Sequence, residues 1–239
     1  MQMSFIRRTF ISGVTKSFYQ QQIMGLLLSA FILILIYPKT GLDQSLIAPY
    51  FDTVTKSFSL KHQFFLEEIM HVGLRNSMII TAICVLALGL SGNRIAPLRA
   101  YAGAYSRPLL WVFVGMILST SIISILKSLS IHGCPNDLIQ YGGNLPYLKL
   151  FEALPQGIEA GHCFPAGHAS GGFALLAFYL AFRDSYPKFS FVMLGVSIVL
   201  GFAMGWAQMM RGEHFLSHNL WTAWVIWLVL LIQHKIWPP

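Results

Sequence analysis

The chain has 239 residues, of which 55% are apolar and only 10% are charged, and its mean hydropathy is +0.62. Because a soluble domain carries about 25% charged residues, this composition excludes an ordinary soluble protein and indicates a single polytopic membrane domain over residues 1–239. The formal net charge of +7 does not indicate a nucleic-acid partner, since the basic residues form no single patch along the chain. The fold class that we expect is all-α.

Six apolar segments predict six transmembrane helices in one bundle. Three reach the usual length of a spanning helix, about 18 residues, and the other three need flanking residues to cross. In chain order, the segments cover residues 23–37, 77–91, 108–126, 169–182, 189–210 and 220–237. The first follows Arg7, Arg8 and Lys16 and has no small-residue cleavage site, so we interpret it as an uncleaved span rather than a signal peptide.

The placement of charge predicts the orientation of these spans. With the N-terminus inside, the inner segments hold nine basic residues and one acid, and the outer segments hold seven basic residues and eight acids. A cytoplasmic excess of Lys and Arg orients helices during insertion, so we expect both termini in the cytoplasm. The inner loop at residues 92–107, with Arg94 and Arg99, contributes to this excess.

The long segment after the first span has an amphipathic pattern. Phe64, Phe65 and Ile69 interleave with Glu67 and Glu68. This pattern predicts an outer helix that lies in the membrane interface. A short helix packed on the bundle fits the pattern equally well.

Three polar clusters lie at helix ends that the alternating topology brings to one face. Lys127 ends the third span, Gly167 and His168 begin the fourth, and residues 211–218 join the fifth to the sixth. Ionisable residues in such positions indicate a functional site.

The residue types in these clusters are those of an anion site. A helix start at Gly167 offers free N–H groups and the positive end of the helix dipole, and Ala166 lets an oxyanion approach the backbone. Lys127 can add positive charge, and Arg211 can add a guanidinium fork that suits phosphate oxygens. Three histidines can exchange protons near neutral pH, namely His168, His214 and His218.

Two of the clusters resemble motifs of the type 2 phosphatidic acid phosphatase superfamily, the membrane lipid phosphate phosphatases. Pro-Ala-Gly-His at residues 165–168 is similar to that family's Pro-Ser-Gly-His. Lys127, six intervening residues and Cys134-Pro135 match the spacing of its Lys…Arg-Pro motif.

The third cluster completes the resemblance. Ala207-Gln208, five residues, His214, three more residues and His218 match the family's Ser-Arg…His…Asp motif. The motifs occur in the family's order and at its outer helix ends. Four motif positions differ, because Cys134, Ala166, Gln208 and His218 stand where the family has Arg, Ser, Arg and Asp.

The resemblance implies a mechanism that needs no metal and no other cofactor. In the family, the third-motif His attacks phosphorus to form a phosphohistidine, and the second-motif His protonates the leaving oxygen. Carried over, His214 is the nucleophile, His168 is the general acid and Lys127 is a phosphate ligand. His218 takes the orienting position, for which Asn219 and Glu213 are alternatives. Arg211, together with Gln208, Ala166 and Gly167, is expected to contact the substrate.

Cys134 and Cys163 lie beside the first two motifs, on the expected outer face. We expect a disulfide between them that closes a loop of about 30 residues and contributes about 3–4 kcal/mol. Two free thiols are the alternative. The periplasmic face of a bacterial inner membrane would permit the disulfide.

The resemblance therefore implies a membrane phosphatase or phosphotransferase that acts at the outer face on a lipid phosphate or pyrophosphate. Candidate substrates are an isoprenoid pyrophosphate, phosphatidylglycerophosphate, phosphatidate and a lipid A phosphate. One alternative is a metal-dependent hydrolase in which His168, His214 and His218 bind zinc. Another is a non-catalytic descendant that binds lipid phosphates without turnover.

Overall fold

The structure is a computed structural model. It describes the backbone of residues 2–92 and 103–239, and the side chains from residue 17 onward within those ranges. Arg94 and Arg99, which belong to the expected inner loop, lie outside the described residues. The chain divides into two compact units, Met1–Thr40 and Gly41–Pro239, and each is described by itself.

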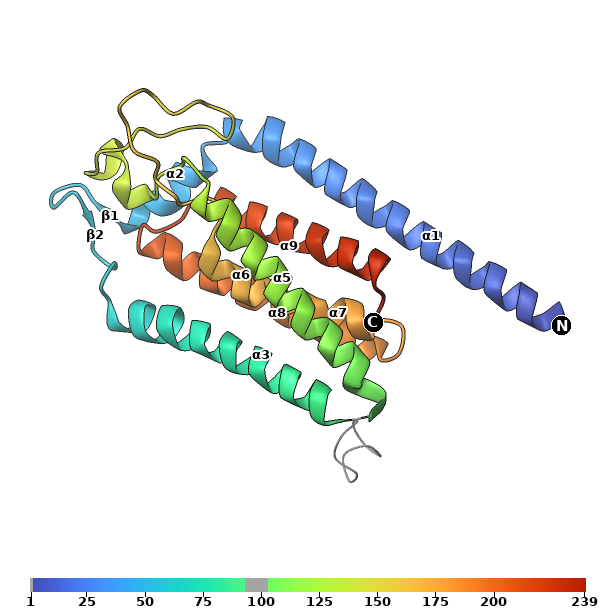
Figure 1. The fold of residues 1–239 in the computed structure, drawn as a ribbon. Helices are drawn as coiled ribbons and strands as arrows, with labels where there is room; N and C mark the ends of the chain where they lie inside the picture. The colour runs from blue at the N-terminus through green and yellow to red at the C-terminus, as the bar shows by residue number, and fades with distance from the viewer. Residues whose placement is uncertain (1, 93–102) are drawn as a thin grey trace. The chain divides into compact units, whose positions relative to one another are not determined.

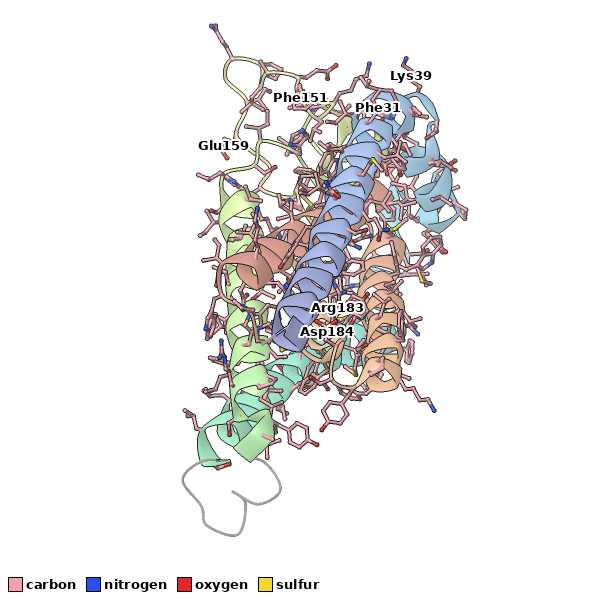
Figure 2. The ribbon with its side chains drawn as sticks, turned by 90° about the vertical axis from the view of Figure 1, so that its right-hand side faces the viewer. Phe31, Lys39, Phe151, Glu159, Arg183 and Asp184 are labelled. Atoms are coloured by element: carbon pink, nitrogen blue, oxygen red, sulfur yellow. A yellow bond between two sulfur atoms is a disulfide. The ribbon has the colours of Figure 1, made fainter. Side chains whose placement is uncertain are left out.

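The first unit is one long helix. Its parts are α1 (Gln2–Phe31), the π-helical segment η1 (Ile32–Ile36) and the 3₁₀ turn η2 (Tyr37–Lys39). Phe31 and Lys39 mark the end of this helix in Figure 2. The run Ser17–Lys39 has a mean hydropathy of 1.8 and is long and apolar enough to cross a membrane.

The second unit is a helical bundle with a small β-hairpin (Figure 1). Its longer helices are α3 (Leu74–Ser91), α5 (Ser106–Ser128), α6 (Gly167–Ala174), α7 (Leu176–Phe182), α8 (Pro187–Met210) and α9 (Leu216–Ile236). Its shorter segments are α2 (Leu42–Ile47), η3 (Ala48–Tyr50), β1 (Phe51–Asp52), β2 (Ser57–Phe58), η4 (Phe65–Gly73), η5 (Gly103–Tyr105), η6 (Pro135–Asp137) and η7 (Ile139–Tyr141). The two strands pair antiparallel, with Phe51 opposite Phe58.

Five helical runs within the described residues are long and apolar enough to span a membrane. They are Ser17–Lys39, Phe65–Ser91, Gly103–Ser128, Pro187–Met210 and Leu216–Ile236. The fourth predicted segment instead forms a shorter apolar helix, Gly167–Phe182, about 24 Å long at 1.5 Å per residue. The structure thus confirms a mainly helical, multi-span protein, whereas the predicted count of six depends on this short helix.

The second span begins at Phe65 and not at residue 77 as predicted. Residues 65–73 form the π-helical segment η4, which continues directly into α3. Phe65 and Ile69, which with Phe64 predicted a separate interfacial helix, therefore belong to this run, and Phe64 is its N-cap residue. Glu67 is compatible with this position because it forms an ion pair with Arg211.

The centre of the bundle is formed by α6 and α7, which are almost entirely buried. They pack against α5, α8 and α9, as Figure 1 shows. The close packing of α6 on α8 depends on small residues, since a Cβ atom on Gly172 would lie 2.5 Å from the backbone nitrogen of Gly201. The helix that begins at the second motif is thereby held on three sides.

The long loop between α5 and α6 lies at one end of the bundle, where Phe151 and Glu159 are labelled in Figure 2, and the turn at Arg183 and Asp184 lies toward the other. At the loop end, a second small core packs around the third motif. Its buried members are Ile47, Phe58, Leu138, Met209 and Phe215. This core fixes both sides of the segment that carries His214.

Candidate active site

The second and third motifs meet in space. The Ala166 N–H donates to the His218 carbonyl at 3.3 Å, and the Thr222 hydroxyl lies 3.0 Å from the Ala166 carbonyl and 2.8 Å from the His218 carbonyl. These bonds join the start of α6 to the first turns of α9. The N–H of Ala166 is therefore engaged, whereas Gly167 lines the cavity described below.

The first motif is joined to the second by a disulfide between Cys134 and Cys163, with an S–S distance of 2.00 Å. Beside it, the Cys163 N–H donates to the His132 carbonyl at 2.9 Å, and the Asn136 N–H donates to the Gly212 carbonyl at 2.9 Å. All three motifs are thus connected by covalent or backbone bonds.

Gly212 ends α8 and sets the direction in which His214 leaves it. The Gly212 N–H donates to the Met209 carbonyl at 3.0 Å, and the Glu213 N–H donates to the Gln208 carbonyl at 2.8 Å. These two bonds form a Schellman motif, which needs a left-handed residue at the position after the cap. Gly212 has φ = +72°, a conformation that costs glycine little.

His214 and His218 form a buried pair. Their Nδ1 atoms are 3.4 Å apart, and Cys163 Sγ also lies 3.4 Å from Nδ1 of His214. A disulfide sulfur cannot donate, so these neighbours favour the tautomer of His214 that carries its proton on Nδ1. That tautomer leaves a lone pair on Nε2, for which the structure shows no hydrogen-bond partner among the described residues.

The surroundings of His214 also keep it neutral. Burial lowers its pKa well below the usual 6.5, and the nearby His218 and Lys127 lower it further. A neutral imidazole with a free Nε2 is the nucleophilic form of the side chain.

The start of α9, which carries His218, is capped by a residue far away in the sequence. Its N-cap residue, Phe215, has no side-chain acceptor. Asp43 supplies one, because its carboxylate accepts the Ser217 N–H at 2.9 Å and also the Ser217 hydroxyl. A carboxylate at a helix N-terminus also interacts favourably with the helix dipole. Asp43 is 5% exposed and was not singled out from the sequence.

His168 is oriented by the π-helical segment η4. Its Nε2 lies 2.8 Å from the Met70 carbonyl, and its ring packs edge-on against His71 with the centroids 4.7 Å apart. Because a carbonyl can only accept, Nε2 carries the proton. No sequence pattern predicts the Met70 contact, since a backbone carbonyl is available at every residue.

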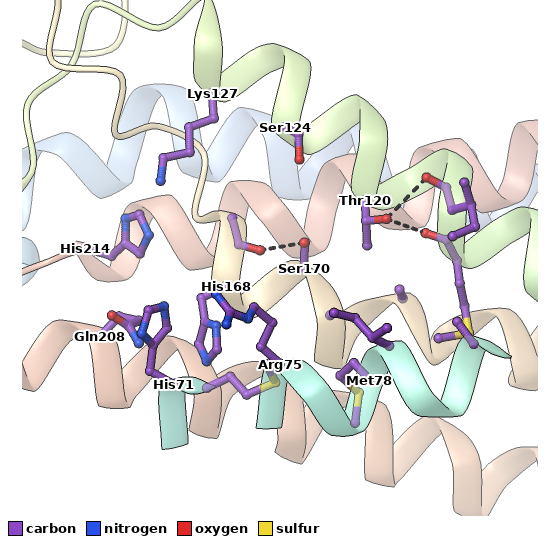
Figure 3. Close-up of a pocket in the computed structure, with 18 of the residues that line it drawn as sticks. His71, Arg75, Met78, Thr120, Ser124, Lys127, His168, Ser170, Gln208 and His214 are labelled. Carbon is purple, nitrogen blue, oxygen red and sulfur yellow. Dashed lines mark hydrogen bonds between the residues drawn. The ribbon is translucent and has the colours of Figure 1, made fainter. Parts of the chain in front are cut away.

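A cavity of about 980 Å³ connects these groups. One part is polar and contains His214, His168, Lys127 and Gln208, as Figure 3 shows. The remainder runs between α3, α5 and α6 and is lined mainly by apolar side chains, among them Met78, Ile79, Ala82, Ile83, Leu86, Phe113, Met116 and Ile117. The site therefore combines proton-exchanging and cationic groups with a long apolar wall.

Lys127 and Arg211, two cationic residues at the cavity, were predicted from the sequence. They differ in their contacts with other residues. Lys127 lies beside the start of α6, because a Cβ atom on Gly167 would be 3.9 Å from its Nζ. In Figure 3 its amine extends toward His214. Arg211 is 5% exposed and donates to Glu67 at 3.2 Å, to the Lys61 carbonyl at 2.8 Å and to Gln208 Oε1 at 3.3 Å.

Two further cavity residues were not assigned a role from the sequence. His71 and Arg75 lie four positions apart on η4 and α3 and both line the cavity. Residues four positions apart on a helix share a face, and this spacing is the sequence pattern from which the pair could have been predicted. It was missed because the span was expected to begin after Arg75.

Glu213 and Asn219, the alternatives to His218 for orienting His214, contact other parts of the protein. Glu213 lies 3.5 Å from Lys61 Nζ and accepts from Asn136 at 3.2 Å. Asn219 faces α8, since a Cβ atom on Gly205 would lie 2.5 Å from its side chain. Among the candidates, His218 is the residue that contacts Nδ1 of His214.

The geometry does not favour the three-histidine zinc site. Within the described residues, His168, His214 and His218 do not bring their ring nitrogens within 4.8 Å of one another as a set. In the part of the chain that the structure describes, the group that meets this distance is Cys134, Cys163 and His214. Two of its members are joined in the disulfide and offer no thiolate.

Comparison with known families identifies the fold family of the chain. A family model described as the PAP2 superfamily matches residues 108–238, more than half of the chain. The chain belongs to the PAP2 superfamily. No curated protein and no solved structure matched it.

Membership of the PAP2 superfamily confirms the resemblance drawn from the three motifs. Together with the apolar helices, it fits a membrane phosphatase. The matched region contains the three motifs but excludes η4 and α3, which supply His71 and Arg75 to the cavity.

Proposed function

We propose that the protein is an integral membrane phosphatase or phosphotransferase that cleaves a phosphate ester or pyrophosphate bond of a lipid through a phosphohistidine intermediate. The observation that carries this proposal is the setting of His214. Its Nδ1 is held by His218 and its ring lines a cavity that also contains Lys127 and His168.

In the first step, Nε2 of His214 attacks phosphorus, and the bond from phosphorus to the leaving oxygen breaks. Lys127 binds the non-bridging oxygens, whose charge it balances as the bond breaks. His168 acts in its imidazolium form and gives one proton to the leaving oxygen. His218 accepts the Nδ1 proton of His214 in a hydrogen bond and so keeps the attacking nitrogen in the required tautomer.

In the second step, water attacks the phosphorus of the phosphohistidine. His168 is now neutral and takes a proton from that water, and the P–N bond breaks to release phosphate and regenerate His214. If an alcohol of a second molecule replaces water, the same step is a phosphotransfer.

The apolar wall supports a lipid substrate. From Arg75 to Leu86 the cavity follows α3 for about 16 Å at 1.5 Å per residue. A phosphate in the polar part would leave an attached hydrocarbon chain between α3 and α5. An isoprenoid pyrophosphate, phosphatidylglycerophosphate, phosphatidate and a lipid A phosphate all have this form.

For the membrane arrangement, we propose six crossings, with Gly167–Phe182 as the short fourth. An even number of crossings puts both termini on the same side, which the basic inner segments assign to the cytoplasm. The site would then face the periplasm of a bacterial inner membrane, where the disulfide can persist.

The test is a phosphate-release assay on purified protein with the four lipids above, compared with water-soluble phosphate monoesters. We expect release from at least one lipid and an acid-labile, base-stable phosphoenzyme. His214→Ala should abolish both. His62→Ala is the matched control, because His62 is exposed and does not line the cavity. Full activity in His214→Ala would refute the mechanism, and tight lipid binding without phosphate release would indicate a binding protein.

A further inference from the structure

We propose that Arg75 is a phosphate ligand of this site and supplies a guanidinium that two of the motif positions lack. The inference rests on the proposed function and extends it to a residue outside the three motifs. It follows from the location of Arg75, from how the neighbouring charges are paired, and from an unpaired donor on Gln208.

Arg75 reaches the site from a separate element. It lies in the first turn of α3 and lines the cavity with Lys127 and His168. In Figure 3 its side chain extends toward His168. The residue one turn earlier, His71, packs against the same ring. The helix that orients the proposed general acid therefore also brings a guanidinium to the polar part of the cavity.

The pairing of charges distinguishes Arg75 from Arg211. Arg211 contacts Glu67, the Lys61 carbonyl and Gln208 Oε1, so each of its three nitrogens already donates to a protein acceptor and its charge is paired with Glu67. Glu213, the one acidic residue among the described residues that line the cavity, lies 3.5 Å from Lys61 Nζ. In the part of the chain that the structure describes, no acidic side chain lies within ion-pair distance of Arg75. Arg75 is exposed, so its guanidinium is available to an anion that enters the cavity.

Gln208 provides an independent sign of a bound acceptor. Its side chain is 3% exposed and lines the cavity, and its Oε1 accepts from Arg211. That bond fixes the orientation of the amide. Its Nε2 is buried and has no partner among the described residues. Buried polar groups are almost always satisfied, so an orphaned donor at a cavity wall indicates an acceptor that comes with a ligand.

The available donors match a phosphate. Arg75 and Lys127 bring positive charge, and Gln208 brings an amide N–H. A phosphate has several acceptor oxygens, and a guanidinium can bind two of them at once. Cys134 and Gln208 occupy the two positions where the family has Arg, and Cys134 is held in the disulfide. A guanidinium from α3 would restore the charge that these positions lost.

The direct test is binding of inorganic phosphate and of orthovanadate to the purified full-length protein in detergent, which needs no turnover. We expect Arg75→Gln to weaken the binding of both ions about 10- to 100-fold, as expected for loss of a charge-assisted pair. Arg75→Lys should weaken it less, since it keeps the charge but loses the fork. Lys149→Gln is the control, because Lys149 is exposed, lies in the long loop at the site end and does not line the cavity.

Lipid phosphate release then separates this inference from the proposed function. We expect Arg75→Gln to lower kcat/KM about 10- to 100-fold, with Arg75→Lys between it and the wild type. An inactive wild type that binds phosphate more tightly than Arg75→Gln would refute the catalysis and support the role of Arg75. Unchanged anion affinity in both Arg75 variants would overturn this inference and leave the role of His214 untouched. If Arg75→Gln does not fold, Arg75→Lys decides by the same comparison.

Discussion

His214 and His218 face each other across 3.4 Å between their Nδ1 atoms, and both rings are buried. The family has an Asp in place of His218. An imidazole can accept the Nδ1 proton as a carboxylate does, but it brings no negative charge to stabilise an imidazolium. The pair therefore sets the tautomer of the proposed nucleophile without raising its basicity.

Substitution of His218 should separate its effect on the tautomer of His214 from the effect of charge on the basicity of His214. His218→Ala removes the acceptor, so we expect kcat to fall on the order of 100-fold. His218→Asp keeps an acceptor and adds a negative charge that raises the pKa of His214. The acid limb of the kcat/KM profile should then move to higher pH, as measured by phosphate release across the pH range. His234→Gln, in the last turn of the same helix, is the control. Equal pH profiles for His218→Asp and the wild type would contradict this account.

The folded state should become less stable as the pH is lowered, because His214 is held neutral in it. A histidine in an unfolded chain titrates near pH 6.5, whereas burial lowers the pKa of folded His214 well below that value. As the pH drops below about 6.5, the unfolded chain takes up a proton that the folded chain does not, so the folded state loses stability. We expect the apparent Tm in detergent to decline from about pH 6.5 downward, and to decline less steeply in His214→Gln. Identical declines would show that His214 does not contribute.

Removal of the disulfide should affect both stability and activity. In Cys134→Ala/Cys163→Ala the first and second motifs are no longer linked, and the contact of Cys163 with Nδ1 of His214 is lost. We expect a loss of up to about 3–4 kcal/mol in the free energy of unfolding and a lower kcat. Thermal unfolding and phosphate release measure the two effects. Cys84→Ala, which removes the free cysteine, should behave as the wild type.

Gly212→Ala should be strongly destabilising. The left-handed conformation at this position disfavours alanine, and a Cβ atom would collide with the ring of Phe58. We expect a loss of several kcal/mol, typical of overpacking combined with backbone strain, and inactive protein. Gly195→Ala is the matched control, since a Cβ atom there meets no neighbour within 4 Å. A Gly212→Ala variant with wild-type stability would show that the Schellman turn does not constrain this segment.

The sequence predicted which segments come together, because the motif spacing and the alternation of spans were sufficient for that. His168, His214 and Lys127 line one cavity, and Cys134 is bonded to Cys163, as expected. The contacts that fix each side chain were not predictable. The engagement of Arg211 with Glu67, the cap from Asp43 to Ser217 and the bond from His168 to Met70 each join positions about 100 residues or more apart.

The beginning of the second helical run shows why its bounds could not be predicted from the sequence. Glu67 and Glu68 suggested that residues near Phe65 stay in the interface, since isolated acids do not belong in a spanning helix. The ion pair with Arg211 removes this restriction for Glu67, and no local pattern reports it. As a result the helix extends back to Phe65, and Arg75 lies within it.

The cap that Asp43 provides has a consequence for biosynthesis. His218 and the capped residue Ser217 belong to α9, and Ser217 is synthesised 174 residues after Asp43. Until α9 has been inserted, Asp43 has no helix to cap and His214 has no imidazole beside its Nδ1. A nascent chain that has not yet inserted α9 therefore lacks the assembled candidate site.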